Sequence, residues 1–158
     1  EKNLIGRLDL NIIPGIPALA AAAASLGAPL MHDFASISLS DLLTPWEVIE
    51  KRIRAAAEAD FVIVLYNPRS KTRTWQLKTA CSLISACRPG NTPIGVVKSA
   101  SRKDERVTLT SLEGLDTGMV DMKCTVIIGN SQSRTVGNWL LTPRGYAGKY
   151  NLAQENGG

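Results

Sequence analysis

The chain has 158 residues and a formal net charge of +4, with 44% hydrophobic and 20% charged residues. These values are typical of one soluble domain with a core of its own. They exclude a bilayer-spanning segment, because no apolar run reaches the roughly 20 residues that this requires. No basic region followed by an apolar stretch marks a signal peptide either. We therefore expect a cytoplasmic protein without membrane contact.

The first elements predicted along the chain are a strand and a helix. Apolar and polar residues alternate over residues 8–12, which is typical of a strand, and this strand should end at Pro14. Pro17 suits the first turn of a helix, where a missing N–H costs nothing. The alanines at 20–24 favour the helix, and Gly27 is a plausible stop. So many alanines would let this helix lie close to a neighbouring sheet.

A half-buried strand and a second helix follow. Residues 34–40 alternate small polar with apolar side chains, which indicates a strand. Thr44 can cap a helix whose first residue is Pro45, and Glu47 lies three positions after the cap, as in a capping box. Apolar residues then recur at helical spacing to about residue 58.

The second half of the chain predicts further strands around one more helix. Two continuously apolar runs, 61–65 and 125–128, are typical of strands covered on both faces. Residues 74–87 show helical spacing, with Cys87 as the last inward-facing position. Shorter strands are predicted over residues 93–98 and 106–110 and, as an edge strand, over 139–141.

This alternation of strands and helices predicts a single α/β domain. Five or six strands with only three clear helices favour a mixed sheet, because some neighbouring strands must pair antiparallel through short turns. We expect helices on both faces of that sheet, with residues 61–65 and 125–128 at its centre. From residue 147 the composition turns polar, so residues 147–158 are predicted to be a flexible tail.

Several chemistries find little support in the residues. Three cysteines, Cys81, Cys87 and Cys124, form no C-x-x-C pair and accompany one histidine, His32, so we expect no metal site. No P-loop, G-x-G-x-x-G or G-x-S-x-G motif is present. Aromatic residues make up only 5% of the chain and no dense basic stripe occurs, which argues against a nucleic-acid partner.

The loops that follow the strands are the places for a ligand, because crevices in open α/β sheets lie beyond the C-terminal ends of strands. The richest loop carries Arg69, Lys71 and Arg73 after the most buried predicted strand. Arginine can grip a carboxylate at two points, so a polycarboxylate ligand is one interpretation. A solvated loop that only keeps the protein soluble is the other. The loops considered are 14–18, 41–45, 66–73 and 99–106.

Several residue strings carry a resemblance to a known family. Pro-Gly-Ile-Pro-Ala at 14–18 and Leu-Gly-Ala-Pro-Leu-Met-His-Asp-Phe at 26–34 resemble the start of the second domain of tetrapyrrole methylases. The strings at 38–46 and 65–70 are similar to the precorrin-3B C(17)-methyltransferase branch, and those at 126–131 and 142–146 agree. The resemblance covers roughly residues 8–146. It implies that residues 1–146 form the C-terminal domain, without the N-terminal domain that family members also have.

The resemblance implies S-adenosylmethionine as methyl donor, bound in the cleft between two α/β domains. Family contacts to the donor in this domain are largely backbone groups at strand ends. Carried over by similarity, they fall on Pro17, Ala18, Tyr66, Asn67, Ala100 and Thr125.

The resemblance also implies the reaction, a methyl transfer to C-17 of precorrin-3B or its cobalt form, with ring contraction, in cobalamin biosynthesis. Positioning of the reactants should then be the protein's main contribution. Ring contraction moves protons, and the candidates for a general acid or base are His32, Asp41 and Tyr66. Macrocycle carboxylates would be gripped by the three basic residues of loop 66–73. A homodimer is expected, as is usual in the family.

Other functions compete with this interpretation. A sister enzyme acting on another precorrin carbon would share the fold. A half-enzyme could instead be a non-catalytic binding or dimerisation domain, and we expect this chain alone to be inactive. A nucleic-acid-binding module would reveal itself by a steep dependence of binding on salt.

Overall fold

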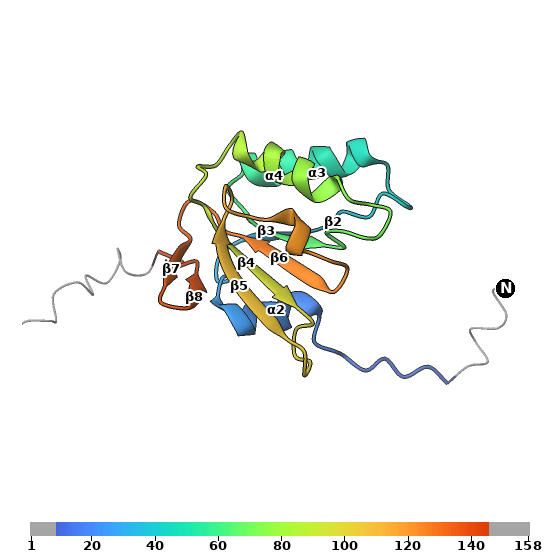
Figure 1. Ribbon diagram of the computed structural model, residues 1–158. Helices are drawn as coiled ribbons and strands as arrows, with labels where there is room; N and C mark the ends of the chain where they lie inside the picture. Colours follow the sequence, from blue (N-terminus) through green and yellow to red (C-terminus); the bar gives the residue numbers. More distant parts are fainter. Residues whose placement is uncertain (1–8, 146–158) are drawn as a thin grey trace, which may run out of the picture.

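The computed structural model describes residues 9–145, which form a layered α/β domain (Figure 1). The elements follow in the order α2 (Ala18–Leu26), β1 (Gly27–Ala28), β2 (Phe34–Ser38), α3 (Trp46–Glu58), β3 (Val62–Tyr66), α4 (Gln76–Ser85), β4 (Pro93–Lys98), β5 (Arg106–Ser111), the 3-10 turn η1 (Thr117–Met119), β6 (Cys124–Ile128), β7 (Arg134–Val136) and β8 (Trp139–Leu141). Within these residues no helix is both long and apolar enough to cross a membrane.

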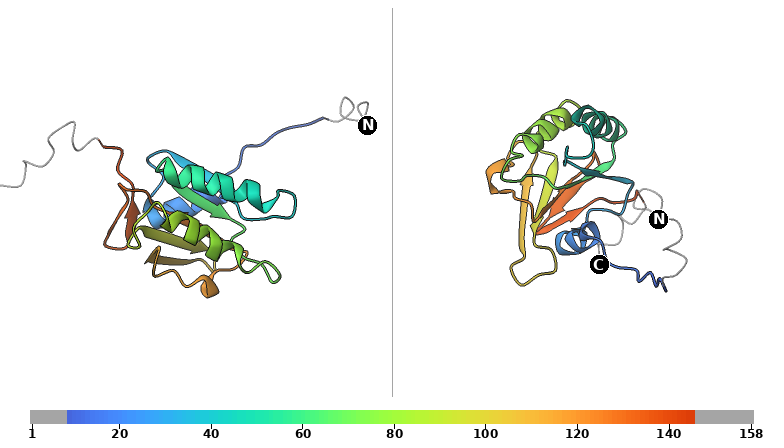
Figure 2. Two further views of the ribbon diagram at one scale, coloured as in Figure 1. Left: turned by 90° about the horizontal axis from the view of Figure 1, so that it is seen from above. Right: turned by 90° about the vertical axis from the view of Figure 1, so that its right-hand side faces the viewer.

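The main sheet has five strands in the order β2-β3-β6-β4-β5. Strand β2 is parallel to β3, whereas β6 is antiparallel to both β3 and β4, and β5 is antiparallel to β4. Strands β2, β3 and β4 therefore end at the same edge of the sheet, and β6 begins there. Helices α3 and α4 cover one face and α2 the other (Figure 2). The predicted mixed sheet is confirmed, with residues 62–65 and 125–128 in inner strands, whereas Phe61 precedes β3 and is 37% exposed.

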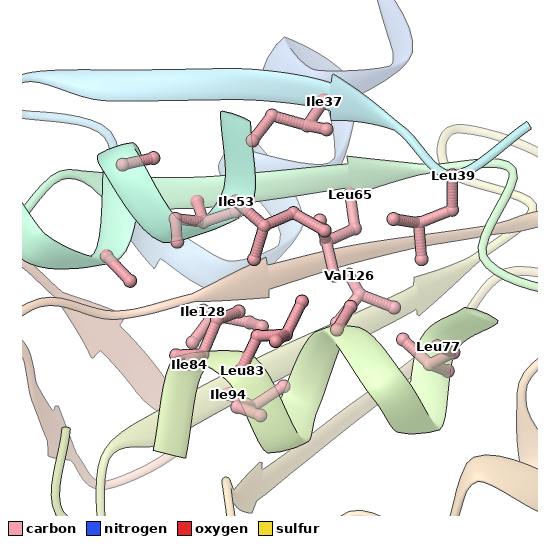
Figure 3. Close-up of a cluster of buried hydrophobic side chains, with 14 of the residues drawn as sticks. Ile37, Leu39, Ile53, Leu65, Leu77, Leu83, Ile84, Ile94, Val126 and Ile128 are labelled. Atoms are coloured by element: carbon pink, nitrogen blue, oxygen red, sulfur yellow. The ribbon is translucent and has the colours of Figure 1, made fainter. Parts of the chain in front are cut away.

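The larger core lies between the sheet and the pair α3 and α4. Leu65, Val126 and Ile128 point from the central strands toward Ile53 of α3 and Ile84 of α4 (Figure 3). Apolar residues at helical spacing supply the buried stripe of each helix, as the sequence predicts. These side chains are fully or almost fully buried, so this core packs the sheet against its two helices.

The smaller core, on the opposite face, depends on close approach. Helix α2 buries Ala22 and Leu26 against Val64 and Ile127. A Cβ added at Gly95 would come within 2.5 Å of the Leu26 side chain, so the absence of a side chain there makes room for Leu26. The prediction that an alanine-rich helix would lie close to a sheet is confirmed by this packing.

Three local predictions about strands and exposure are wrong. Residues 9–17 form no strand, and Ile12 is 91% exposed. Alternation alone does not make a strand, which needs a neighbour for its hydrogen bonds, and no described strand pairs with this segment. Residues 139–141 are not an edge strand, because β8 lies between β1 and β7 in a second, three-stranded sheet. Cys87 is exposed rather than inward-facing, because α4 ends two residues earlier, at Ser85.

The predicted capping box is also wrong. Helix α3 begins at Trp46, with Pro45 as its N-cap and no side-chain hydrogen bond to the cap. The helix begins one residue later than predicted, so Thr44 lies one residue before the N-cap. From there its hydroxyl is not at the position that caps the first turn. The predicted tail, residues 147–158, lies outside the described residues, as does Tyr146.

Candidate functional site

The loops predicted to hold a ligand gather at one edge of the main sheet, which we call the pocket edge. It is the edge at which β2, β3 and β4 end and β6 begins. Helix α2 also begins here, since the backbone N–H of Leu19 donates to the Tyr66 hydroxyl at 2.6 Å. That hydrogen bond satisfies one of the free N–H groups of the first helical turn and ties α2 to the end of β3. The opposite edge is called the far edge below.

The first pocket at this edge, the α2 pocket, has a volume of about 510 Å³. It lies between the start of α2, the loop after β4 and the start of β6. Ala18, Ala100 and Thr125, three of the residues assigned to donor contacts, all line it. Two of the three are alanines, so a ligand could approach the backbone closely.

The other three residues assigned to the donor lie beside this pocket. Tyr66 is half-buried and holds the start of α2 in place. Asn67 adopts a left-handed conformation, with φ of 50°, and its side-chain amide donates to Ser38 Oγ at 3.0 Å. Pro17 is the N-cap of α2, and its carbonyl accepts from the N–H groups of Ala20 and Ala21. None of these three lines the α2 pocket itself.

The loop after β4 lines the α2 pocket and is stabilised by hydrogen bonds between its own residues. Ser99 and Ser101 have φ of 52° and 60°, a conformation that is uncommon for residues other than glycine. The Ser99 hydroxyl donates to Asp104 at 3.0 Å, and the Ser101 N–H donates to Glu105. The hydrogen bond from Ser99 lowers the pKa of Asp104. Local strain held by such contacts is typical of binding sites.

The second pocket, the basic pocket, has a volume of about 440 Å³ and is lined by Arg69, Lys71 and Lys123. The apolar Val120 and Met122 and the acidic Asp121 also line it. Arg69 Nη1 donates to the carbonyl of Thr117 at 3.0 Å, which fixes the guanidinium. Cations around an apolar floor suit a flat, largely apolar ligand that carries carboxylates.

Arg73 lies behind this pocket rather than on its lining. Its guanidinium donates to the carbonyl of Asn67 at 2.7 Å and to Ser40 Oγ at 3.4 Å. It also lies 3.4 Å from the Met122 sulfur. Arg73 therefore joins the segments that follow β2 and β3 to the residues before β6. The structure brings Arg69 and Lys71 together and assigns Arg73 to the support of the loop.

The two pockets adjoin, because Met122 and Lys123 line both of them. These residues belong to the short turn that precedes β6. Neither residue was predicted from the sequence, since no motif marks this turn and only the pairing of β6 with β4 brings it to the pocket edge. A lysine that stands just before an apolar strand, among cations on other loops, was the only available signal.

The candidate acids and bases do not lie together. Asp41 and Tyr66 are both at the pocket edge, and Asp41 accepts from the side-chain amide of the buried Gln76 at 2.9 Å. His32 precedes β2 at the far edge, where its Nδ1 accepts from the Asp33 N–H at 2.8 Å. Over residues 9–145, no three His, Cys, Asp or Glu residues are grouped as a metal ion would require.

Comparison with known proteins places this architecture in a family. The sequence model of the tetrapyrrole (corrin/porphyrin) methylases matches residues 5–116. A probable cobalt-factor III C(17)-methyltransferase of Salmonella typhimurium is 55% identical over 139 residues, which cover 88% of this chain and 58% of that protein. A precorrin-3B C(17)-methyltransferase of a Sinorhizobium species is 48% identical and is covered over 58% of its length.

A solved structure agrees with the sequence comparisons. The crystal structure of the methyltransferase CobJ superposes with a TM-score of 0.83 at 38% identity, over 89% of this chain and 59% of that one. The chain thus spans somewhat more than half the length of the relatives that it matches. It belongs to the tetrapyrrole (corrin/porphyrin) methylase family.

Proposed function

We propose that this chain provides one wall of a methyltransferase site that methylates C-17 of precorrin-3B or of its cobalt form, with ring contraction. The observation that carries the proposal is the shared wall between the two pockets, formed by Met122 and Lys123. A methyl transfer requires donor and acceptor atoms in contact and in line. Two adjoining pockets of different chemistry would bring two ligands side by side, which supports the proposal.

The α2 pocket is the proposed place of the donor, S-adenosylmethionine. Its volume lies within the range of about 300–1,000 Å³ that is usual for small-molecule sites. Ala18 and Ala100 leave room for a ligand against the backbone, and Thr125 adds a hydroxyl. When bound, the donor supplies an already activated methyl group, so this chain need provide no covalent nucleophile. Its residues bind, orient and exclude water.

The basic pocket is the proposed place for carboxylates of the macrocycle. Arg69, Lys71 and Lys123 offer positive charge around an apolar floor. For the proton transfers of ring contraction, Asp41 and Tyr66 remain candidates because both lie at the pocket edge. His32 is left out of the proposal, since it stands at the far edge.

A sister enzyme that methylates another precorrin carbon would share these pockets, as would a binding domain without activity of its own. The names of the relatives favour C-17. A homodimer stays a prediction from the family resemblance, and a cytoplasmic location stays a prediction from the composition of the sequence. Sedimentation velocity would test the first.

A matched pair of substitutions on α2 tests the donor site. Ala18 and Ala24 are both exposed, but only Ala18 lines the α2 pocket. By calorimetry, Ala18→Trp should weaken the binding of S-adenosylhomocysteine at least about tenfold, or roughly 1.4 kcal/mol, whereas Ala24→Trp should leave it unchanged. Equal affinities in both variants would place the donor elsewhere.

The reaction itself is tested in a hybrid. This chain would replace the matching 58% of the Salmonella typhimurium relative. Incubation with S-adenosylmethionine and the cobalt-containing or cobalt-free precursor should give a product with one added methyl group by mass spectrometry. Methylation at a carbon other than C-17 would favour the sister enzyme, and a hybrid that binds both ligands without turnover would favour the binding domain.

A further inference from the structure

We propose that Lys98 and Asp121 form a positioning pair that holds Met122 and Lys123 in place as the wall between the two pockets. Lys98 Nζ lies 2.7 Å from Asp121 Oδ2. Lys98 is the last residue of β4, and its backbone is in register with Cys124 at the start of β6. Lys98 therefore belongs to a strand that is paired on both sides, with β5 and β6. Asp121 is the first residue of the turn that contains Met122 and Lys123.

Asp121 fastens that turn at several points. Its Oδ1 accepts from the backbone N–H of Lys123 at 2.9 Å and lies 3.4 Å from Cys124 Sγ. Its own carbonyl accepts from the Cys124 N–H at 3.1 Å. One carboxylate thus closes the turn through one oxygen and joins it to β4 through the other. Asp121 is part of the basic pocket lining, but Lys98 lines neither pocket, so any effect of Lys98 on ligand binding must act through its neighbours.

The turn is joined to the donor side as well. The carbonyl of Lys123 accepts from the Ser99 N–H at 3.0 Å, which links the wall to the loop behind the α2 pocket. The backbone of Lys123 is therefore held on both sides, by Asp121 at its N–H and by Ser99 at its carbonyl. Its side chain stays 65% exposed, with Asp104 at 3.8 Å. A fixed backbone with an exposed charged end is suited to binding a carboxylate at a defined place.

The pKa shifts agree with this geometry. The hydrogen bond and the charge of Asp121 raise the pKa of Lys98, and the hydrogen bond from Lys98 lowers the pKa of Asp121. Each group thus favours the charged form of the other. Exposed ion pairs contribute little to overall stability. The pair is therefore expected to matter for the geometry of one turn rather than for the fold.

The inference rests on the proposed donor site, and a double-mutant cycle tests it. Lys98→Met removes the cation, and Asp121→Asn removes the anion but keeps an oxygen for the Lys123 N–H. Each should weaken the binding of S-adenosylhomocysteine by about threefold or more, and the double variant should be no weaker than either single one. Lys98→Arg should restore binding, because arginine also pairs with a carboxylate. Lys78→Met, an exposed lysine of α4 that lines neither pocket, is the control.

The outcomes separate this inference from the proposed function. Additive losses in the double variant, or single variants that bind as well as the parent chain, would overturn the positioning pair while leaving the donor site intact. If neither the parent chain nor the hybrid with the Salmonella typhimurium relative binds S-adenosylhomocysteine, the donor site is wrong. Hydrogen exchange then decides the positioning pair, since Lys98→Met but not Lys78→Met should speed exchange of the Lys123 and Ser99 amides.

Discussion

The two edges of the main sheet use arginine in different ways. At the far edge, Arg88 is only 6% exposed and donates to the carbonyls of Ala56, Phe61 and Gly129. At the pocket edge, Arg69 donates to one carbonyl, that of Thr117, and lines the basic pocket. The same side chain is thus a structural tie at one edge and a candidate ligand contact at the other. The difference is that the Arg88 guanidinium is buried among the protein's own carbonyls, whereas Arg69 is part of a pocket lining.

Backbone strain differs between the edges in the same sense. Among residues 9–145, four residues other than glycine have positive φ, and three of them, Asn67, Ser99 and Ser101, lie at the pocket edge. The fourth, Asp60, lies at the far edge, where its carboxylate accepts from the Ser131 N–H at 2.9 Å and from the Ser131 hydroxyl. At the far edge, the residue with positive φ makes hydrogen bonds within the protein. At the pocket edge, the residues with positive φ lie in loops that line the α2 pocket or lie beside it.

The largest expected effect comes from breaking the tie at the far edge. Burial lowers the pKa of Arg88, because it disfavours the charged guanidinium, and the charge of nearby Asp60 opposes that shift. Arg88→Met should lower the free energy of unfolding by about 3 kcal/mol, because three carbonyls lose their donor. Urea unfolding measures it. Arg54→Met, which removes an exposed pair with Glu50, is the control and should cost at most about 0.5 kcal/mol. Equal losses in the two variants would contradict the comparison.

The corresponding change at the pocket edge should affect binding rather than stability. Arg69→Ala should weaken the binding of a fluorescent polycarboxylated porphyrin by about 1.5–3 kcal/mol, the scale of a hydrogen bond to a charged group. Arg69→Lys should recover only part of the loss, because an ammonium cannot make a two-point contact. Fluorescence titration of the hybrid enzyme measures both. Unchanged affinity in both variants would mean that the carboxylates are held elsewhere, for example by Arg102 and Lys103.

A smaller effect is expected where α2 meets β3. Tyr66→Phe removes the hydroxyl that accepts from the Leu19 N–H. The free energy of unfolding should fall by about 1 kcal/mol, the net value of a typical hydrogen bond, and the Leu19 amide should exchange faster. Urea unfolding and hydrogen exchange measure these two results. A variant as stable as the parent, with unchanged exchange at Leu19, would show that the bond does not hold α2.

The smallest effect concerns pH. The pKa of Asp121 is lowered in the folded protein, so the ion pair's contribution to stability is fully present above pH 3.8, the ordinary pKa of an aspartate. That contribution is lost as pH falls through the lower pKa of the folded protein. The raised pKa of Lys98 means that its contribution is present below 10.5 and is lost as pH rises through the higher value. Asp104 and Cys124 also face Lys98 and raise its pKa slightly.

Amide chemical shifts measure that pH window. The Lys123 amide should be constant between the two limits and should change beyond each of them. Lys98→Met should move the acidic change upward, toward the ordinary pKa of an aspartate, and should reduce the alkaline change to the part that comes from the Cys124 thiol. Identical pH profiles in the variant and the parent chain would contradict the pairing.

Much of the fold could be predicted because burial leaves a direct pattern in sequence. The short, β-branched apolar runs at 61–65 and 125–128 favoured interior strands, and the helical spacing of α3 indicated its buried face. The strand predicted at residues 8–12 failed because alternation does not reveal whether a partner strand exists. The edge strand predicted at 139–141 failed because its neighbour β1 is two residues long and carries no strand signal.

The site was less predictable. Family resemblance pointed to Ala18, Ala100 and Thr125, which the fold brings to one pocket. The wall residues Met122 and Lys123 could not be found, because their position depends on the register between β4 and β6. Sequence alone could not distinguish Arg73 from Arg69 either. The carbonyl that Arg73 meets belongs to Asn67, and asparagine adopts both left-handed and other backbone conformations in loops.

The most direct test of the central claim is an NMR titration of this chain with S-adenosylhomocysteine. We expect the amides of Ala18, Tyr66, Ala100 and Thr125, which come from four separate segments, to shift together along one saturable curve. Amides at the far edge, such as that of Arg88, should not move. Saturable shifts confined to the far edge, or no shift at any of the four amides, would contradict the assignment of the α2 pocket to the methyl donor.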